Sequence, residues 1–345
     1  MNRFVAGVAA LGIAVLTSAA AFAGETKIAW SHYTGWEPLG VMQSSGIMDK
    51  WNKKMGTDIE IVYIGDYVDS ITLYAAGQFA GVAVTNMDVL AIAGVGGRTS
   101  TALIVGDYSN GNDGLILKGF ASLDVVPTDT TISLVEYSVS HYLLARCLGR
   151  AGMNIDDFEL LNITDADIPG LVESSDEVIA VSWNPMLMTI QNMTGVNVVC
   201  TSNQIPGEII DMVVVGDEVT NVEKMALVGA WYEMMALIET RDSDTIAALA
   251  EQAGGSVADF EAQLETTHMF YTPADAVTFV RSPELFTTMG SVINFSFDAG
   301  IYDGVDSVDE LGVSFPNGTV MGDSSNVMLK FDTSITEMAA DGQLN

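Results

Sequence analysis

The chain has 345 residues, of which 45 are Asp or Glu and 13 are Lys or Arg, so its formal net charge is −32 at neutral pH. Such an excess of acid repels a phosphate backbone, which excludes nucleic acid as a partner. Apolar residues make up 49% of the chain, which excludes a disordered protein.

The first residues show the pattern of a secretory signal peptide. Arg3 supplies a positive charge, residues 4–16 form an apolar segment, and Ala21-Phe22-Ala23 forms a cleavage site of small residues. The apolar segment is shorter than the roughly 20 residues that span a bilayer. We therefore expect residues 1–23 to be removed and the rest of the chain to be exported to a bacterial periplasm.

Short apolar segments then alternate with helical patterns, which predicts βαβ units and a parallel sheet covered on both faces. The first series has strands at Lys27–Trp30, Ile59–Ile64, Gly81–Val84 and Leu103–Gly106, with helices at Pro38–Met55 and Tyr67–Ala76 and from Asp88 onward. The second series has strands at Gly114–Leu117, Thr131–Leu134, Glu159–Ile163, Val178–Val181 and Val196–Val199, with helices at His141–Arg150, 168–172 and 186–192. A strand at Asp211–Val215 and helices at Lys224–Glu239, Ser243–Glu251, Ala258–Glu265 and Pro283–Ala299 follow.

Two such series predict an α/β protein with two lobes. The expected division is lobe one at 24–117, lobe two at 118–211, and a return to lobe one at 212–345, whose helical tail packs on lobe one. Ligands of open α/β sheets bind at the carboxyl ends of the strands, so we expect a small molecule to be enclosed between two sets of strand-end loops by hinge closure.

The cysteines and histidines predict neither a metal site nor a cofactor. Cys147 and Cys200 are the only cysteines, and they form either a disulfide or two buried free thiols. The histidines are scattered, and no His-x-x-x-His or Cys-x-x-Cys pair occurs.

The strand-end loops are rich in carboxylate, amide and aromatic side chains, and they contain no Lys or Arg. The candidate ligand-binding residues are Trp36, Asp66, Asn86, Asp88, Glu136, Ser138, Trp183, Asn184 and Glu208, together with Trp30, Tyr33 and Asp107. Several of them have a structural alternative, because Asp66 and Asp88 stand where helix N-caps stand and Trp183 could pack on the core.

The segment "VEYSVSHY" (135–142) places Glu136 before a predicted helix. A helix start carries partial positive charge and often binds an anion, so a glutamate there disfavours an anionic ligand. Carboxylates and aromatic faces instead suit a cation or a strong hydrogen-bond donor.

Several long motifs, among them "IAWSHYTGWEPLG", "LVEYSVSHYLLAR", "VSWNPML" and "NQIPGEIIDMVVV", resemble periplasmic substrate-binding proteins of ABC transporters in the nitrate/taurine/thiamine-precursor class. Within that class they are most similar to the urea carboxylase-associated branch. The resemblance runs from about Lys27 to the end of the chain. It implies a type II periplasmic binding fold, a monomer that delivers a nitrogen-rich solute to an ABC permease, and guanidinium before urea as that solute.

Two other functions remain open from the sequence. An anion-binding transporter component of the same fold, for a sulfonate or nitrate, would use Arg98 in "GGRTS". An enzyme related to pyrimidine synthesis would need acid or base chemistry, for which His141 beside Glu136 is the only candidate. We expect a binding protein and no enzyme, because the chain has no catalytic triad order, metal motif or phosphate loop.

Overall fold

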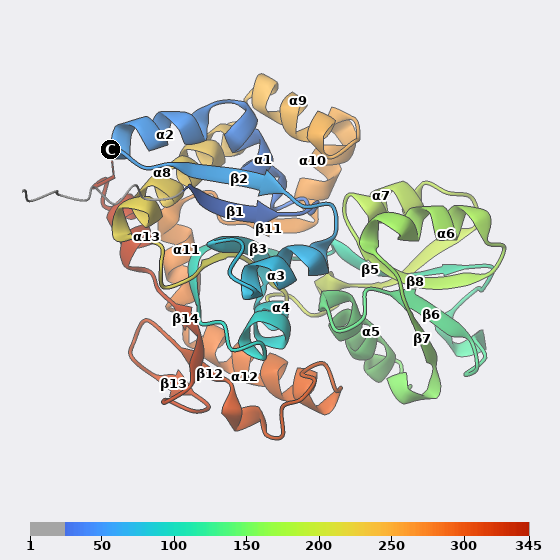
Figure 1. Ribbon diagram of the computed structural model, residues 1–345. Helices are drawn as coiled ribbons and strands as arrows, with labels where there is room; N and C mark the ends of the chain where they lie inside the picture. The colour runs from blue at the N-terminus through green and yellow to red at the C-terminus, as the bar shows by residue number, and fades with distance from the viewer. Residues whose placement is uncertain (1–24, 345) are drawn as a thin grey trace, which may run out of the picture.

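The computed structural model describes residues 25–344, so the predicted signal peptide lies outside the described residues. Two β-sheets with helices packed against them form two lobes over this range (Figure 1). The smaller second lobe, drawn in green, stands beside the larger first lobe, to which both ends of the chain contribute. The predicted α/β class is confirmed.

The first sheet has nine strands within residues 25–344 and belongs to lobe one. In spatial order its strands are β13 (Val320–Met321), β12 (Gly312–Ser314), β14 (Val327–Phe331), β4 (Ser100–Ser109), β10 (Ile210–Val215), β3 (Gly81–Thr85), β1 (Thr26–Trp30) and β2 (Ile59–Tyr63), and β11 (Thr267–Met269) pairs with β4. Strands β1, β2 and β3 are parallel, whereas β10 is antiparallel to both β3 and β4. The amino end of β10 therefore lies beside the carboxyl ends of its two neighbours.

Helices cover this sheet. They are α1 (Glu37–Ser44), α2 (Ile47–Met55), α3 (Tyr67–Ala75), α4 (Asn86–Asp88), α8 (Asn221–Glu239), α9 (Ser243–Gln252), α10 (Val257–Glu265), α11 (Pro273–Val280), α12 (Pro283–Asp298) and α13 (Ser334–Ala340). Helix α8 shows why they dock: Trp231 is 1% exposed, and full burial of a large apolar side chain stabilises a fold by about 1.5–3 kcal/mol.

The second sheet has five strands within the same range and belongs to lobe two. Its order is β7 (Glu159–Asn162), β6 (Thr131–Leu134), β8 (Val178–Trp183), β5 (Asp113–Lys118) and β9 (Val196–Thr201), and its helices are α5 (Val139–Arg150), α6 (Ile168–Ser174) and α7 (Met186–Gln191). The chain crosses between the lobes at 110–112 and again at 202–209.

The structure corrects three sequence-based boundaries. Strand β5, which we assigned to lobe one, pairs antiparallel with β8 and β9, so the first crossing precedes it. The helix predicted at Pro38–Met55 is two helices, because Gly46 adopts a left-handed conformation (φ 80°) that turns the chain between them. The tail is not purely helical, because β14 pairs in parallel with β4.

A disulfide joins Cys147 of α5 to Cys200 of β9, which decides between the two states that the sequence left open. It ties a helix of lobe two to an edge strand of the same lobe across 53 residues of chain. Disulfides persist in oxidising compartments, so this bond favours a protein that acts outside the cytoplasm.

Loss of this disulfide is expected to destabilise the protein. Replacing both Cys147 and Cys200 with alanine should lower the free energy of unfolding by about 2–4 kcal/mol, because the unfolded chain regains the freedom of a long loop. Urea denaturation of the variant and of the parent protein under non-reducing conditions measures the difference. Equal midpoints and slopes would contradict this expectation.

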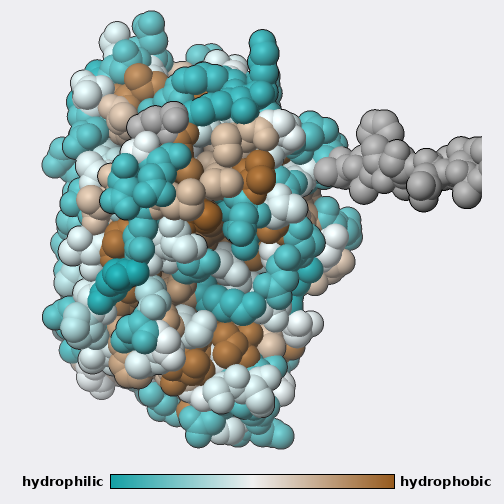
Figure 2. All heavy atoms as spheres, turned by 90° about the vertical axis from the view of Figure 1, so that its left-hand side faces the viewer, coloured by the Kyte–Doolittle hydropathy of each residue, from teal (hydrophilic) through white to brown (hydrophobic). Residues whose placement is uncertain are grey.

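The surface of lobe one is largely hydrophilic, as the high net charge of the chain predicts (Figure 2). Figure 2 shows the face of lobe one that points away from lobe two, where hydrophilic side chains dominate and apolar ones form small separate patches. No helix within residues 25–344 has the length and apolarity that crossing a membrane requires.

Candidate ligand-binding site

A small cavity lies between the lobes, and we call it the interlobe cavity. It is lined by Tyr33, Trp36, Tyr67, Thr85 and Asp211 of lobe one, Asp113, Val139 and Trp183 of lobe two, and Ile209 of the second crossing. In this arrangement of the lobes it has room for about one water molecule. A solute of several heavy atoms therefore requires the lobes to stand further apart than they do here.

A larger surface hollow of about 490 Å³ lies on lobe one, against Phe286 and Phe315. It is lined only by residues between 280 and 319 and does not reach lobe two. The interlobe cavity is the better candidate because it lies at the strand ends, where α/β sheets bind their ligands.

Strand pairing brings the polar lining residues together. Asp211 at the amino end of β10 lies opposite Thr85 of β3 and opposite Asp107 of β4. In lobe two, Asp113 at the start of β5 lies opposite Trp183 at the end of β8. Directly opposed side chains of neighbouring strands lie close together within each sheet. Asp211 of the first sheet and Asp113 of the second both line the interlobe cavity.

Aromatic rings form another part of the wall. Tyr33 contacts Trp36 at a centroid distance of 5.0 Å, Trp36 contacts Tyr67 at 5.4 Å, and Tyr67 contacts Trp183 edge-on at 5.6 Å. The series of rings crosses from lobe one to lobe two. The indole nitrogen of Trp36 is buried and has no hydrogen-bond partner among the described residues.

The carboxyl groups at the cavity are buried without a counter-ion. Burial raises the pKa of Asp113 to about 7. Burial, and then the negative charge of Asp107, raise the pKa of Asp211 well above its usual range. Burial also raises the pKa of Asp107, whose Oδ1 accepts a hydrogen bond of 2.9 Å from Tyr33 Oη. A cation between these groups would lower their pKa values, because it favours the ionised form.

None of the lining residues is basic. Arg98, the residue on which the anionic alternative rested, pairs with Glu218 and lies over the ring of Tyr74. Arg146 pairs with Glu208 at 2.8 Å. Both guanidinium groups are therefore already paired with a carboxylate of the protein.

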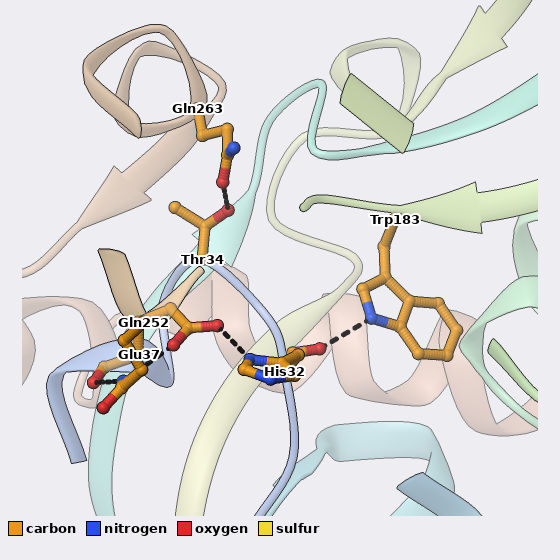
Figure 3. Close-up of polar contacts among 6 residues, drawn as sticks. All are labelled: His32, Thr34, Glu37, Trp183, Gln252 and Gln263. Atoms are coloured by element: carbon orange, nitrogen blue, oxygen red, sulfur yellow. Dashed lines mark hydrogen bonds and ion pairs between the residues drawn. The ribbon is translucent and has the colours of Figure 1, made fainter. Parts of the chain in front are cut away.

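The loop after β1, which carries Tyr33 and Trp36, is held by helices of the tail (Figure 3). The Nδ1 atom of His32 lies 2.7 Å from Glu37 Oε1, and Gln252 Nε2 of α9 donates to Glu37 Oε2 at 2.7 Å. Thr34 Oγ1 donates to Gln263 of α10 at 3.0 Å. The tail therefore positions two cavity-lining rings.

Two hydrogen bonds join the lobes across the cleft, and a third joins lobe two to the second crossing. Trp183 Nε1 of lobe two donates to the carbonyl of His32 at 3.0 Å (Figure 3). The backbone N–H of Val139 in lobe two donates to Asp88 Oδ2 of lobe one at 3.1 Å. Tyr142 Oη donates to Glu208 Oε2 in the second crossing at 2.6 Å.

The candidate residues fall into four groups by position. Trp36, Trp183 and Tyr33 line the interlobe cavity. Asp88 and Asp107 are buried behind the lining residues. Asp88 accepts a hydrogen bond from Tyr67, and Asp107 accepts one from Tyr33.

Four candidates hold the backbone. Asp66 caps α3 by accepting from Asp69 N, and Ser138 caps α5 by accepting from Ser140 N. Asn86 accepts from Ile210 N and donates to the carbonyl of Glu208. Asn184 N donates to Asn112 at the first crossing.

The remaining candidates lie elsewhere. Trp30 is buried in the core beside Tyr63, and Glu208 holds Arg146 and Tyr142. Glu136 is half-exposed and does not line the cavity in this arrangement of the lobes, so its contact with a ligand stays a prediction. The N–H of Val139 at the start of α5 binds Asp88.

Sequence reasoning missed Asp113, Asp211, Tyr67, Thr85, Val139 and Ile209 as lining residues. The available signal was an aspartate within or at the start of an apolar strand, in "NDGLILK" and "IIDMVVV". A charged residue is rarely buried in such a segment unless it is paired or functional.

The chain was compared with known proteins. No protein-family model and no curated protein sequence matches it. Solved structures with the same fold include the alkanesulfonate-binding protein SsuA from Xanthomonas axonopodis pv. citri bound to MOPS, at 12% identity and a TM-score of 0.67, over 81% of this chain and 94% of that one.

Two others are the periplasmic aliphatic sulphonate-binding protein SsuA from Escherichia coli (15% identity, TM-score 0.61, 79% of this chain and 87% of that chain) and the periplasmic nitrate-binding protein NrtA from Synechocystis PCC 6803 (12%, 0.57, 92% and 97%). At these identities the likeness establishes the architecture. This chain has the two-lobe α/β fold of the periplasmic binding proteins.

Proposed function

We propose that this protein is the periplasmic solute-binding component of an ABC importer and that it captures a small nitrogen-rich solute, guanidinium first and urea second, in the interlobe cavity. One observation carries the proposal. Two buried carboxyl groups and four aromatic rings from both lobes line the cavity, and no basic side chain does.

The chemistry of guanidinium matches this wall. Its N–H groups lie in one plane and pair with carboxylate oxygens in parallel hydrogen bonds. Its charge would replace the missing counter-ion of Asp113 and Asp211. Its faces can stack on an indole ring, where a cation gains about 0.5–2 kcal/mol. Asp211 lies within hydrogen-bond reach of Asp107 and its pKa is raised well above its usual range, so Asp113 is the cavity-lining carboxyl group that supplies the negative charge.

Urea has a similar plane and size but no charge. It donates N–H groups to the same oxygens, and a protonated Asp211 could donate to its carbonyl oxygen. Because urea carries no charge, it leaves Asp113 without a counter-ion when that carboxyl group is ionised, which is why urea ranks second.

An anionic ligand is the alternative, and the sulfonate and nitrate ligands of the structural neighbours favour it. An anion in this cavity would face Asp113 and Asp211 without an Arg or Lys side chain. Like charges at short range in a buried site repel strongly, so the electrostatics of the wall oppose this alternative.

The proposed location and partner follow from the export pattern in the sequence and from the fold. The disulfide suits an oxidising compartment such as the periplasm. The partner would be an ABC permease in the inner membrane, to which a monomer delivers its solute without chemical change.

Titration calorimetry at slightly alkaline pH tests the proposal, with guanidinium, urea, methylguanidine, taurine and nitrate as ligands. Saturable binding of guanidinium with one site per chain is expected, together with a change in Trp fluorescence because Trp36 and Trp183 line the cavity. Binding of taurine or nitrate with no heat from guanidinium or urea would overturn the cationic ligand and leave the anionic alternative.

A further inference from the structure

The N-terminus of α5 points into the contact between the lobes. The helix spans Val139–Arg150, and Ser138 caps it by accepting a hydrogen bond from Ser140 N. The N–H of Val139 is left over at this end, where a helix carries partial positive charge. Free anions commonly bind at such a position.

A carboxylate of the opposite lobe occupies this position. Asp88 of α4 is 0% exposed, and its Oδ2 accepts from Val139 N at 3.1 Å and from Tyr67 Oη at 2.7 Å. Its Oδ1 is buried and has no partner among the described residues. Because Val139 and Tyr67 both line the interlobe cavity, Asp88 lies directly behind the cavity wall.

We propose that Asp88 is a built-in anion: it takes the place of an anionic solute at the N-terminus of α5, joins the lobes there, and so determines that the interlobe cavity admits cationic and neutral solutes. Asp88 is thus a positioning and specificity-determining residue. This inference deepens the proposed function, since it says what sets the charge of the accepted solute.

Two physical consequences support this assignment. Asp88 belongs to lobe one and Val139 to lobe two, so their hydrogen bond exists only when the lobes are together. A tethered carboxylate is always present at the helix end, whereas a dissolved anion must be bound from solution and must displace it. A soluble anion therefore gains nothing from α5 while Asp88 is intact.

Chemical rescue tests the assignment. Asp88→Ala removes the carboxylate and leaves space for formate, which carries the same group, whereas formamide has nearly the same shape without the charge. We expect Asp88→Ala to melt below the parent protein. Formate at about 100 mM should raise its melting temperature by about 2–5 °C in a saturable way, because a ligand of the folded state stabilises by mass action. Formamide should have no such effect.

The controls are the parent protein and Asp88→Asn, in which the site is filled, and neither should respond to formate. If Asp88→Ala does not fold, Asp88→Ser serves in its place, because serine also leaves room for formate. Small-angle X-ray scattering should show a larger radius of gyration for the alanine variant and a return toward the parent value with formate. Equal effects of formate and formamide, or none from either, would overturn the proposal.

This result is independent of the solute. Formate rescue without guanidinium binding to the parent protein would refute the proposed function and keep the role of Asp88. Guanidinium binding to the parent protein without formate rescue would support the proposed function and refute the role of Asp88.

Discussion

Asp113→Asn is expected to weaken guanidinium binding by roughly 30-fold to 5,000-fold, equivalent to about 2–5 kcal/mol. The side chain keeps its shape but loses the negative charge that faces the solute from lobe two. Loss of one partner of a buried charge pair is costly because water does not replace it. Calorimetry or competition against a fluorescent reporter of closure gives the ratio of dissociation constants.

The matched control is Asp165→Asn. Asp165 is also buried, at 3% exposure, and burial also raises its pKa, but it does not line the interlobe cavity. Its variant should bind guanidinium within a few-fold of the parent protein. Asp113→Asn should stay folded at alkaline pH, since it removes a carboxylate whose ionised form is poorly solvated. Equal affinities of Asp113→Asn and the parent would contradict the assigned contact.

Guanidinium affinity should rise with pH, by about 100-fold between about pH 5 and about pH 8 for each carboxyl group with a pKa near 7 that must ionise. Asp113 is such a group, because burial raises its pKa to about 7. Below that pH the group holds a proton, which the cation must displace, and above it the carboxylate is already ionised. The gain therefore accumulates up to about pH 7 and then levels off for this group.

Binding should accordingly release protons, which calorimetry in buffers of different ionisation enthalpy measures directly. The Asp113→Asn variant is the control and should show a shallower pH profile than the parent protein. An affinity that is constant over this range, or that falls as the pH rises, would contradict the account.

The same carboxyl groups affect the ligand-free protein in the opposite sense. Their pKa values in the folded state lie above the ordinary value, so between about pH 4 and about pH 7 the folded state binds more protons than the unfolded state. The contribution of these groups to the free energy of unfolding is fully present below this range and is lost as the pH rises through it. Above about pH 7, where this contribution is lost, bound guanidinium should raise the free energy of unfolding again.

Much of the fold follows from local patterns in the sequence. Alternation of apolar segments and helical periodicity predicted two series of βαβ units with parallel strands. The parallel pairs in the two sheets confirm this in part, but β5 and β10 run antiparallel to their neighbours. The predictions were wrong where contacts between distant parts of the chain determine the secondary structure. Strand β14 pairs with β4 across more than 200 residues of chain, and the short β12 and β13 depend on that pairing, so no local signal predicted a sheet extension in the tail.

The candidate site shows the same limit. The loops at the carboxyl ends of the predicted strands contain Trp36 and Trp183, which line the cavity. Asp211 is not in such a loop, because β10 runs antiparallel and presents its amino end at that edge of the sheet. Asp113 lies in the loop predicted after the fourth strand but was not among the candidates; the chain enters lobe two directly after β4, so the start of β5 faces the cleft. Strand direction and crossing points come from the assembled sheets, not from local sequence.

The absence of basic residues in the strand-end loops was the more reliable signal. This absence of Lys and Arg is a property of loop composition, so it can be recognised without knowing which loops come together in the fold. The lining residues include no Lys or Arg, as the loops predicted, although the carboxylates that contribute are Asp113 and Asp211 in place of Glu136.

The most direct measurement is a crystal structure of the protein grown with guanidinium at pH 8, with taurine and nitrate as competing solutes. We predict a planar guanidinium in the interlobe cavity, within hydrogen-bond distance of Asp113 and Asp211 and against an indole ring. A sulfonate or nitrate in that cavity, or guanidinium bound only elsewhere, would contradict the claim that this site is built for a cation.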